Sequence, residues 1–244
     1  MSNEPQFIQT DGSVAVIVPV LNEEASLADW PTGLLQTPFN ELIVIDGGST
    51  DATVSRLQQC TQDYPALSII ESGKGRAAQM AAGAETARSE WLLFLHADTQ
   101  LPRNYQSALS ECARANRQWG RFDIQFSSLS GWFDVVMKVV AAFINARSRF
   151  THIATGDQAI FVHRNTYHAV GGMPQQALME DIELSKRLKR AGPGFMARQR
   201  VTTSARRWHR DGVVKTILLM WRLRVRYYFG ASPDELAQYY RDTR

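Results

Sequence analysis

The chain has 244 residues, of which 44% are hydrophobic and 21% are charged, and its formal net charge is +3. This composition is that of an ordinary globular protein, long enough for one large domain, and it argues against a disordered chain. No stretch reaches the roughly 20 uninterrupted apolar residues of a membrane-spanning helix. The first residues lack the features of a signal peptide, and Cys60 and Cys112 have neither metal-site spacing nor a paired framework. We therefore expect a cytoplasmic protein with reduced cysteines.

Charge is divided unevenly along the chain. Residues 186–244 carry 15 Lys and Arg against 4 Asp and Glu, whereas residues 1–185 carry 12 against 20. An acidic first part suits a divalent cation, and a basic end suits phosphate groups or an anionic membrane surface, although a solvated basic helix has the same composition. The segments 129–150 and 213–229 are apolar but interrupted by charges, so they are amphipathic. They favour either peripheral contact with the inner face of the membrane or burial against the domain or a second subunit of a homodimer.

Short apolar runs alternate with helix-like stretches in the first half of the chain. Runs of four or five apolar residues between polar turns predict buried parallel strands. The expected strands lie at about 14–18, 42–46, 67–71 and 91–95, and the expected helices at about 23–36, 51–61, 73–87 and 102–116. Asn22 is the expected cap of the first helix. This order predicts an α/β fold with a doubly wound, mostly parallel sheet and helices on both faces.

The second half of the chain is less regular. Strands are expected at about 119–126, 157–163 and 195–203, and helices at about 129–149, 179–191, 211–229 and 233–242. Ser232 and Pro233 fit the cap and first turn of the last helix. We expect one α/β domain over residues 1–203 and a basic helical extension over 204–244 that packs on it or next to it.

Polar signals follow the ends of the expected strands. They are Pro19-Val-Leu-Asn-Glu-Glu24, Asp46-Gly-Gly-Ser-Thr-Asp51 and His96-Ala-Asp98, with Glu180-Asp181 at the head of a later helix. Ligands of open parallel sheets bind at the carboxyl ends of the strands, where these loops would gather.

In this order, these motifs and a Gly73-Lys-Gly-Arg76 helix start resemble glycosyltransferase family 2, which has the GT-A fold. The resemblance covers about residues 12–195. It implies an inverting transferase that uses a divalent cation, Mn²⁺ or Mg²⁺, to move a sugar from a nucleotide-sugar donor to an unknown acceptor, and the expected donor is a UDP-sugar. More narrowly, His-Ala-Asp, Thr155-Gly-Asp-Gln-Ala-Ile-Phe161 and Ser204-Ala-Arg-Arg-Trp208 resemble the bacterial subgroup of radical-SAM- or selenodomain-associated, arsenosugar-type glycosyltransferases.

The resemblance assigns donor-binding residues in the first half of the chain. Asp46 would bind the nucleotide base, and Glu23 and Pro19 would line the nucleoside pocket. The structural alternatives are that Asp46 leads an Asx turn and that Glu23 is an acid of the first helical turn. Lys74 and Arg76 would contact the diphosphate or ribose, because glycines and a helix start let an anion approach the backbone. Lys74 is alternatively a solvated side chain.

The resemblance places the cation at His96-Ala-Asp98. The family usually carries Asp-x-Asp here, and the last acid, Asp98, would bind the ion that neutralises the leaving diphosphate. His96 stands where the first acid is usual, so it is either a ligand that suits Mn²⁺ better than Mg²⁺, a donor-binding group or a structural strand-end residue.

The acceptor side is expected around Glu180 and Asp181. By resemblance Asp181 is the general base and Glu180 orients the acceptor or the base. The structural alternative is that both acids are there only because the helix dipole favours negative charge in the first turn. Gly156, Asp157 and Gln158 would line the acceptor side, unless they form a plain turn.

The basic segment 204–210 would close over the donor. Arg206 and Arg207 would clamp the diphosphate, Trp208 would stack on a sugar or acceptor, and His209 would be a further metal ligand. A solvated basic loop is the alternative.

Other functions fit the sequence less well. A sugar-nucleotidyltransferase or a dehydrogenase would place a glycine-rich loop after the first strand, where this chain has Pro19-Val-Leu-Asn22. A non-enzymatic protein that binds a membrane surface or nucleic acid would use the basic end but leave the internal acids unexplained. We therefore expect no nucleic-acid partner.

Overall fold

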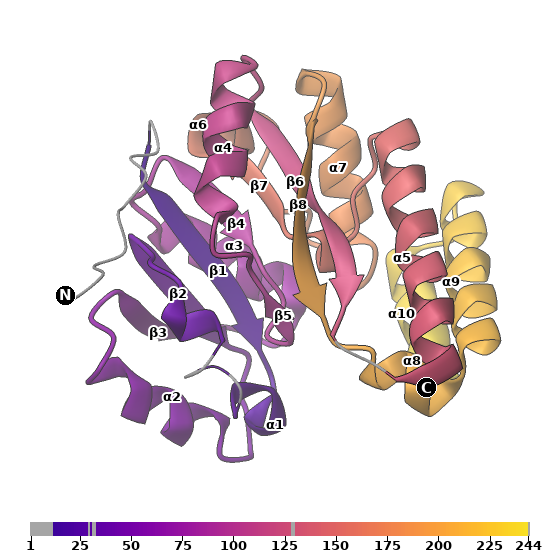
Figure 1. The fold of residues 1–244 in the computed structure, drawn as a ribbon, viewed down its shortest axis with the longest axis horizontal. Helices are drawn as coiled ribbons and strands as arrows, with labels where there is room; N and C mark the ends of the chain where they lie inside the picture. Colours follow the sequence, from indigo (N-terminus) through magenta and orange to yellow (C-terminus); the bar gives the residue numbers. More distant parts are fainter. Residues whose placement is uncertain (1–11, 29, 31–32, 128–129, 244) are drawn as a thin grey trace.

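The protein is described by a computed structural model that covers residues 12–28, 30, 33–127 and 130–243. It contains one eight-stranded sheet in the order β3-β2-β1-β4-β7-β6-β8-β5, with helices packed around it (Figure 1). The mostly parallel α/β sheet with helices on both faces confirms the expected fold class.

The first four strands form the parallel part of the sheet. They are β1 (Val14–Val20), β2 (Glu41–Asp46), β3 (Leu67–Glu71) and β4 (Trp91–Phe94), and all three pairings among them are parallel. Pro19 is accommodated in the central strand because the pairing of β1 with β4 ends at Ile17 and Phe94, so its missing N–H is not needed there. All four predicted strands are confirmed within one or two residues.

The remaining strands mix the two directions. β7 (Ile160–His163) is antiparallel to β4 and to β6 (Trp119–Phe126), whereas β8 (Phe195–Thr203) is parallel to β6. The short β5 (Thr99–Gln100) pairs antiparallel with the end of β8. This pairing brings the loop after β4 next to the start of the C-terminal segment.

Side-chain alternation along the strands builds a core on each face of the sheet. Val14, Val16 and Val18 of β1 point to one face, and Ala15 and Ile17 point to the other. The first face is covered by α1 (Glu24–Leu27), α2 (Thr53–Thr61), α4 (Tyr105–Arg114) and part of α5 (Gly131–Thr151); the second is covered by α3 (Arg76–Thr86), α6 (Arg164–Ala169) and α7 (Glu180–Ala191). The parallel strands are therefore buried on both sides.

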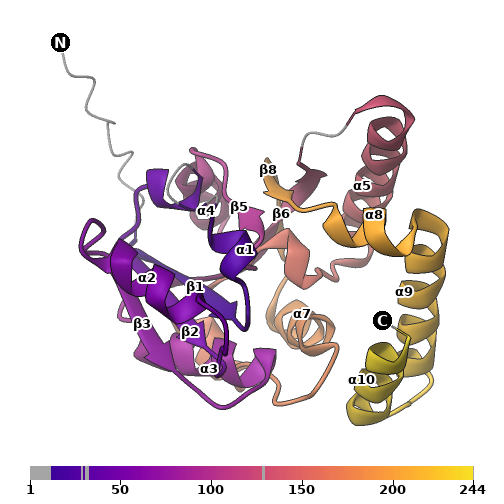
Figure 2. The same cartoon turned by 90° about the horizontal axis from the view of Figure 1, so that it is seen from below.

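Three C-terminal helices follow β8. They are α8 (Arg206–Asp211), α9 (Val213–Tyr228) and α10 (Pro233–Asp242). Leu219 and Leu223 of α9 pack with Met179 and Ile182 of the α7 region and with Leu236 of α10. The far side of α9 lies beside α5, and Figure 2 shows α8, α9 and α10 along one edge of the molecule. Among the described helices, none is long and apolar enough to cross a bilayer.

The predicted helix over 23–36 is wrong. Residues 29, 31 and 32 of this range lie outside the described residues, and the described ones form only the single turn α1 and a 3-10 turn, η1 (Leu34–Gln36). The sequence explains this, because Pro31 and Gly33 disfavour a helix interior. Asn22 is not the cap either: its side-chain oxygen accepts a hydrogen bond from Thr50 N at 2.8 Å.

Several other boundaries differ from the prediction. Residues 156–158 form a 3-10 turn, η2 (Gly156–Gln158), so β7 starts three residues later than expected. The helix expected from residue 102 starts at Tyr105, and the helix expected from 211 is preceded by a separate helix, α8. The short helix α6 and the short strand β5 were not predicted. The cap and first turn of α10 are confirmed, since Ser232 Oγ accepts from Glu235 N.

Candidate active site

Loops from four parts of the chain meet at one end of the sheet. His96 follows β4, Gly156 opens η2, Arg76 starts α3, and Glu180 and Asp181 start α7. Figure 2 looks onto this end, where α1, α7 and α8 surround the strand ends. The carboxyl ends of the parallel strands therefore carry the predicted polar residues, as the topology requires.

Arg76 links the first half of the chain to the α7 acids. Its guanidinium forms an ion pair with the buried carboxylate of Glu180, 104 residues away. Nη1 of Arg76 lies 3.3 Å from Nε2 of His96. Because an arginine only donates, Nε2 accepts and the neutral imidazole carries its proton on Nδ1.

His96 is held as a neutral imidazole. Burial, and after it the charge of Arg76, lowers the pKa of His96 to about 3. Gly156 is packed so tightly against this ring that a Cβ atom there would lie 2.4 Å from Nε2. Only glycine lets the η2 backbone approach His96 this closely.

The Asp181 carboxylate is oriented by two backbone N–H groups. Oδ2 accepts from Gly156 N at 2.7 Å, and Oδ1 accepts from Ile182 N at 2.7 Å. The residue before the pair, Met179, has a left-handed backbone with φ of 67°, which is uncommon for a non-glycine residue. These contacts fix the position of Asp181 beside His96 and Gly156.

A second group of side chains connects the loop after β4 with the C-terminal segment. Arg206 Nη2 donates to Ser26 Oγ at 2.8 Å and lies 3.9 Å from Asp98 Oδ2. Ser26 Oγ in turn donates to the Glu23 carboxylate. Burial, and after it the charge of Glu23, raises the pKa of Asp98, while Arg206 acts in the opposite direction. Two carboxylates next to one exposed cation leave net negative charge that a divalent ion would offset.

No group of three or more His, Cys, Asp or Glu side chains in the described part of the chain is arranged to hold a metal ion. His96, Asp98 and His209 are therefore not a three-ligand centre. Nε2 of His96 faces Arg76, and the exposed ring of His209 packs edge-on against Phe133 at 5.3 Å between centroids.

Asp46 forms the Asx turn that was the structural alternative. Its buried carboxylate accepts from Gly48 N at 2.9 Å and from Ser49 N at 3.0 Å. Behind this turn, Nε2 of the buried Gln79 donates to Val20 O at 2.7 Å and to Ile45 O at 2.8 Å. Gln79 thus ties the ends of β1 and β2 together at the floor of the site.

The family is decided by the sequence between β1 and α6. Residues 15–168 match the family model described as glycosyl transferase family 2, which is more than half of the chain. The chain belongs to glycosyl transferase family 2. Glu180, Asp181 and Arg206 lie beyond the matched residues, so it is the fold that brings them to the family-2 domain.

Curated relatives match parts of this family-2 chain. Dodecaprenyl-phosphate galacturonate synthase of Rhizobium johnstonii is 34% identical over 110 residues, which is 41% of this chain and 32% of the relative. The succinoglycan biosynthesis protein ExoA of Rhizobium meliloti is 28% identical over 202 residues, 75% of this chain and 60% of ExoA. The chain thus spans at most about three fifths of the length of these relatives.

Solved structures share the fold of this family-2 protein. A mannosyltransferase from Pyrobaculum calidifontis in complex with GDP-Man and Mn²⁺ has a TM-score of 0.61 at 20% identity, over 82% of this chain and 60% of its own. Residues 1–349 of S. aureus TarS in complex with UDP-GlcNAc have a TM-score of 0.61 at 14% identity, over 79% and 58%. These likenesses confirm the expected GT-A-like fold.

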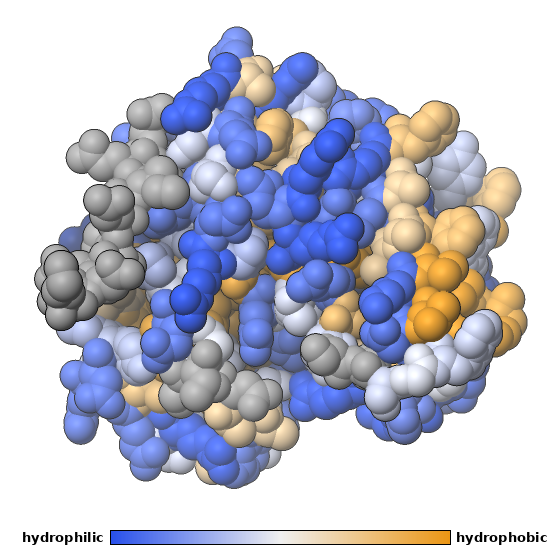
Figure 3. All heavy atoms as spheres, in the orientation of Figure 1, coloured by the Kyte–Doolittle hydropathy of each residue, from blue (hydrophilic) through white to orange (hydrophobic). Residues whose placement is uncertain are grey.

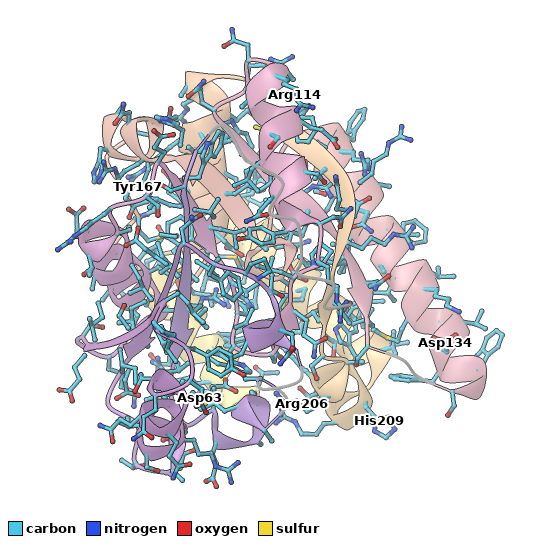
Figure 4. All side chains as sticks on the ribbon, turned by 60° about the vertical axis from the view of Figure 1, so that its left-hand side comes forward. Asp63, Arg114, Asp134, Tyr167, Arg206 and His209 are labelled. Carbon is cyan, nitrogen blue, oxygen red and sulfur yellow. The ribbon has the colours of Figure 1, made fainter. Side chains whose placement is uncertain are left out.

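Three residues of the basic segment 204–210 make their described contacts away from Asp98. Arg207 donates to the Tyr240 hydroxyl and lies 3.8 Å from Asp211, so it faces α10. Trp208 packs against Phe126 at 5.8 Å between ring centroids. Figure 4 shows Arg206 and His209 at the lower edge of the molecule, with His209 pointing outward. Among Arg206, Arg207, Trp208 and His209, Arg206 alone has a described contact with Asp98 and with α1.

The predicted acceptor residues also separate. Gly156 lies between His96 and Asp181, whereas Gln158 is fully buried and its amide bonds Thr155 and Ser148. We therefore assign Gln158 a structural role, as in the plain-turn alternative. Lys74 is exposed beside Gly75, which has a φ of 133° at the start of α3.

Sequence reasoning missed Arg147 on this side of the site. Its Nε and Nη2 atoms are buried, with no hydrogen-bond partner among the described residues. Burial, and after it the charge of Arg224, lowers the pKa of Arg147 to about 10, against the opposing charges of Asp157 and Asp181. The sequence around Arg147 does not indicate a functional role, because the residue lies in an amphipathic helix and only the packing of α5 brings it near α7.

Proposed function

We propose that this chain is an inverting, cation-dependent glycosyltransferase that uses a nucleotide sugar. The observation that supports this best is the contact network of Arg76, His96, Gly156, Glu180 and Asp181. It joins a basic helix start and an oriented carboxylate at the carboxyl end of a GT-A-like sheet. Such a site offers a cation for an anionic leaving group and a carboxylate that can act as a base.

The donor would lie between the β1 and β2 loops and Arg206. We propose that Asp46 and Glu23, with Pro19, bind the nucleoside, and that Arg206, Lys74 and Arg76 face the diphosphate. A UDP-sugar is our preferred donor; the structural neighbours hold UDP-GlcNAc or GDP-Man. Positive side chains and a helix start are suited to a diphosphate.

Asp98 would hold a divalent cation, Mn²⁺ or Mg²⁺. A cation suits this position because the Asp98 carboxylate is desolvated and lies near the carboxylate of Glu23. Burial and like charge make the ionised form of Asp98 unfavourable unless a positive charge offsets it. When bound, such an ion supplies Lewis-acid stabilisation of the negative charge on the leaving diphosphate. Arg206, 3.9 Å from Asp98, would add a second positive charge on the same side.

The proposed step is a single displacement. The acceptor oxygen attacks the anomeric carbon, and the bond from this carbon to the diphosphate oxygen breaks, with the electron pair leaving on the diphosphate. Asp181 takes the proton of the acceptor oxygen, and the backbone N–H of Gly156 keeps its carboxylate in place. Attack from the face opposite the leaving group inverts the anomeric centre. Glu180 holds Arg76 and thereby orients the donor side.

The acceptor is proposed to enter beside Gly156, Asp157 and Arg147. One relative is named for dodecaprenyl phosphate and another for succinoglycan biosynthesis, so lipid phosphates and glycans are the first acceptors to examine. The narrower resemblance to radical-SAM- or selenodomain-associated enzymes remains a proposal that rests on the three short motifs alone.

The test is release of nucleoside diphosphate from a panel of nucleotide sugars with Mn²⁺. We expect turnover by the intact chain and a loss of about 10²–10⁴-fold in Asp181→Asn, the usual worth of a general base. Glu183→Gln, which removes an acid of the same helix that lies two residues on and faces Arg187 instead of Gly156, is the matched control and should keep wild-type turnover. Equal turnover in Asp181→Asn and wild type would reject the assigned base, and no turnover of any donor would reject the function.

A further inference from the structure

Large hydrophobic side chains are exposed on two neighbouring helices. In the described part of the chain, every large hydrophobic residue counted as exposed lies on α5, on α9 or directly after α9. On α5 they are Trp132, Val135, Val139, Phe143 and Phe150; on α9 and after it they are Val214, Leu218, Trp221, Val225, Tyr228 and Phe229. Phe150 is 90% exposed and Trp221 is 65% exposed. Scattered exposed apolar residues are ordinary, but a concentration of this kind marks a contact surface.

The spacing of these residues makes one stripe on each helix. Steps of three, four and seven residues keep them on one face of an α-helix. The opposite face of α5 buries Met137 and Val140, and that of α9 buries Leu219 and Leu223. The outward stripes are therefore not an incomplete core but a second apolar face on helices that are already packed.

The two stripes form a continuous surface, which we call the α5–α9 face. Phe133 and Val136 of α5 belong to the same hydrophobic cluster as Val213 and Ile217 of α9. The two helices lie side by side in Figures 1 and 2. Figure 3 shows apolar side chains gathered over them at the right-hand edge of the molecule.

The charges on this face are mainly positive. Helix α9 carries Lys215, Arg222, Arg224 and Arg226 and has no acidic residue between Val213 and Tyr228. On α5, Asp134 is paired with Lys138 at 2.7 Å and Arg149 with Asp123, so this helix adds no net charge to the face. On α9, Arg226 is paired with Glu235 of α10, and the exposed cations left for the face are Lys215 and Arg222. A helix that combines cations with Trp, Tyr and Phe has the composition of a segment that lies in the headgroup region of a bilayer.

A second copy of the chain fits this face less well. Pairing α9 with α9 would bring the cations of two copies together, and α9 offers no acid to offset them. Anionic lipid headgroups supply the missing negative charge, and the acyl boundary accepts the aromatic side chains.

We propose that the α5–α9 face docks the protein on the anionic surface of a lipid bilayer, with both helices lying in the interface. This goes beyond the proposed transfer reaction and does not depend on it. It would place the side of the site that carries Arg147 and Arg224 next to the headgroups, since both helices also contribute to that side.

The test is flotation of the full chain with vesicles of phosphatidylcholine alone or with added phosphatidylglycerol. We expect binding to the anionic vesicles only. The double variant Phe143→Ser, Trp221→Ser and the double variant Lys215→Glu, Arg222→Glu should each weaken it roughly tenfold or more. Arg114→Glu, a charge reversal on α4, is the matched control and should bind as wild type. All five side chains are exposed, so the thermal transitions should stay unchanged.

Three results would overturn the proposal. The first is equal binding of wild type and both double variants to anionic vesicles, and the second is no vesicle binding by wild type. The third is a dimer in solution, measured by light scattering, that the Phe143→Ser, Trp221→Ser variant dissociates; this would assign the face to a second copy. Neither readout involves nucleotide-sugar turnover, so failure here leaves the proposed function untouched.

Discussion

His96 differs from an ordinary histidine because it is held neutral between Arg76 and the η2 backbone. Its pKa of about 3 in the folded chain lies below the value of 6.5 of an unperturbed side chain. Between these values the unfolded chain binds a proton that the folded chain does not bind. The stabilisation is therefore complete above about pH 6.5 and is lost as the pH falls toward 3.

We predict that the free energy of unfolding falls less steeply with acid in His96→Gln than in wild type. One proton accounts for at most about 1.4 kcal/mol per pH unit in this window. Asp98, whose pKa is raised, acts in the opposite direction, but it is present in both proteins, so the difference isolates His96. Urea unfolding between pH 6 and pH 4 gives the two slopes, and parallel slopes would show that His96 is not held neutral.

Gly156 is a residue where a single methyl group should affect the chemistry. A Cβ atom there would lie 2.4 Å from His96 Nε2 and 3.6 Å from Asp181 Oδ2. We predict that Gly156→Ala lowers turnover about 10²-fold by moving the base, while nucleotide binding at Asp98 and Arg206 is kept. Steady-state turnover and nucleotide affinity measured on the same preparation check this. Wild-type turnover would mean that the close approach of η2 has no part in catalysis.

Helix α8 shows how a short element can connect distant parts of the chain. Arg206 reaches Ser26, 180 residues earlier, and approaches Asp98 after β4. The neighbouring Arg210 instead pairs with Asp211 on its own helix at 2.8 Å. The two arginines are close in sequence, but only Arg206 has a position from which it would reach a donor.

We predict that Arg206→Met weakens nucleoside diphosphate binding about tenfold, which is the worth of one charge-assisted hydrogen bond. Arg210→Met is the matched control on the same helix and should bind as wild type. Calorimetric titration measures both affinities. An equal, small effect of the two substitutions would contradict a specific contact of Arg206 with the diphosphate and would leave α8 only a general electrostatic contribution to binding.

The regular elements were predictable because their signals are local. β1, β2, β3, β6 and β8 follow from apolar runs and alternation, and α10 from its Ser232 cap. The η2 turn was predicted only as an alternative, because its choice over an extended strand depends on Gln158 reaching Ser148 in the core. The pairing of Arg76 with Glu180 was also beyond local patterns: sequence placed each at a helix start, but only the packing of α3 and α7 brings the two starts together.

At the scale of the whole molecule, the uneven charge of the sequence has a structural counterpart. The acidic first part supplies Glu23, Asp46 and Asp98 at the strand ends, and the basic end supplies Arg206 above them and the cations of α9 at the edge. We propose that these two regions correspond to a donor site and a lipid-facing surface. A single chain would then bring an activated sugar and a bilayer close together.

The most direct test of the central claim, that these loops form one cation-assisted nucleotide site, is calorimetric titration of nucleoside diphosphates with and without Mn²⁺. We predict Mn²⁺-dependent binding to wild type that is lost in Asp98→Asn and kept in the Phe143→Ser, Trp221→Ser variant. Binding that is absent from wild type, or unchanged by removing either the ion or the Asp98 carboxylate, would contradict the account.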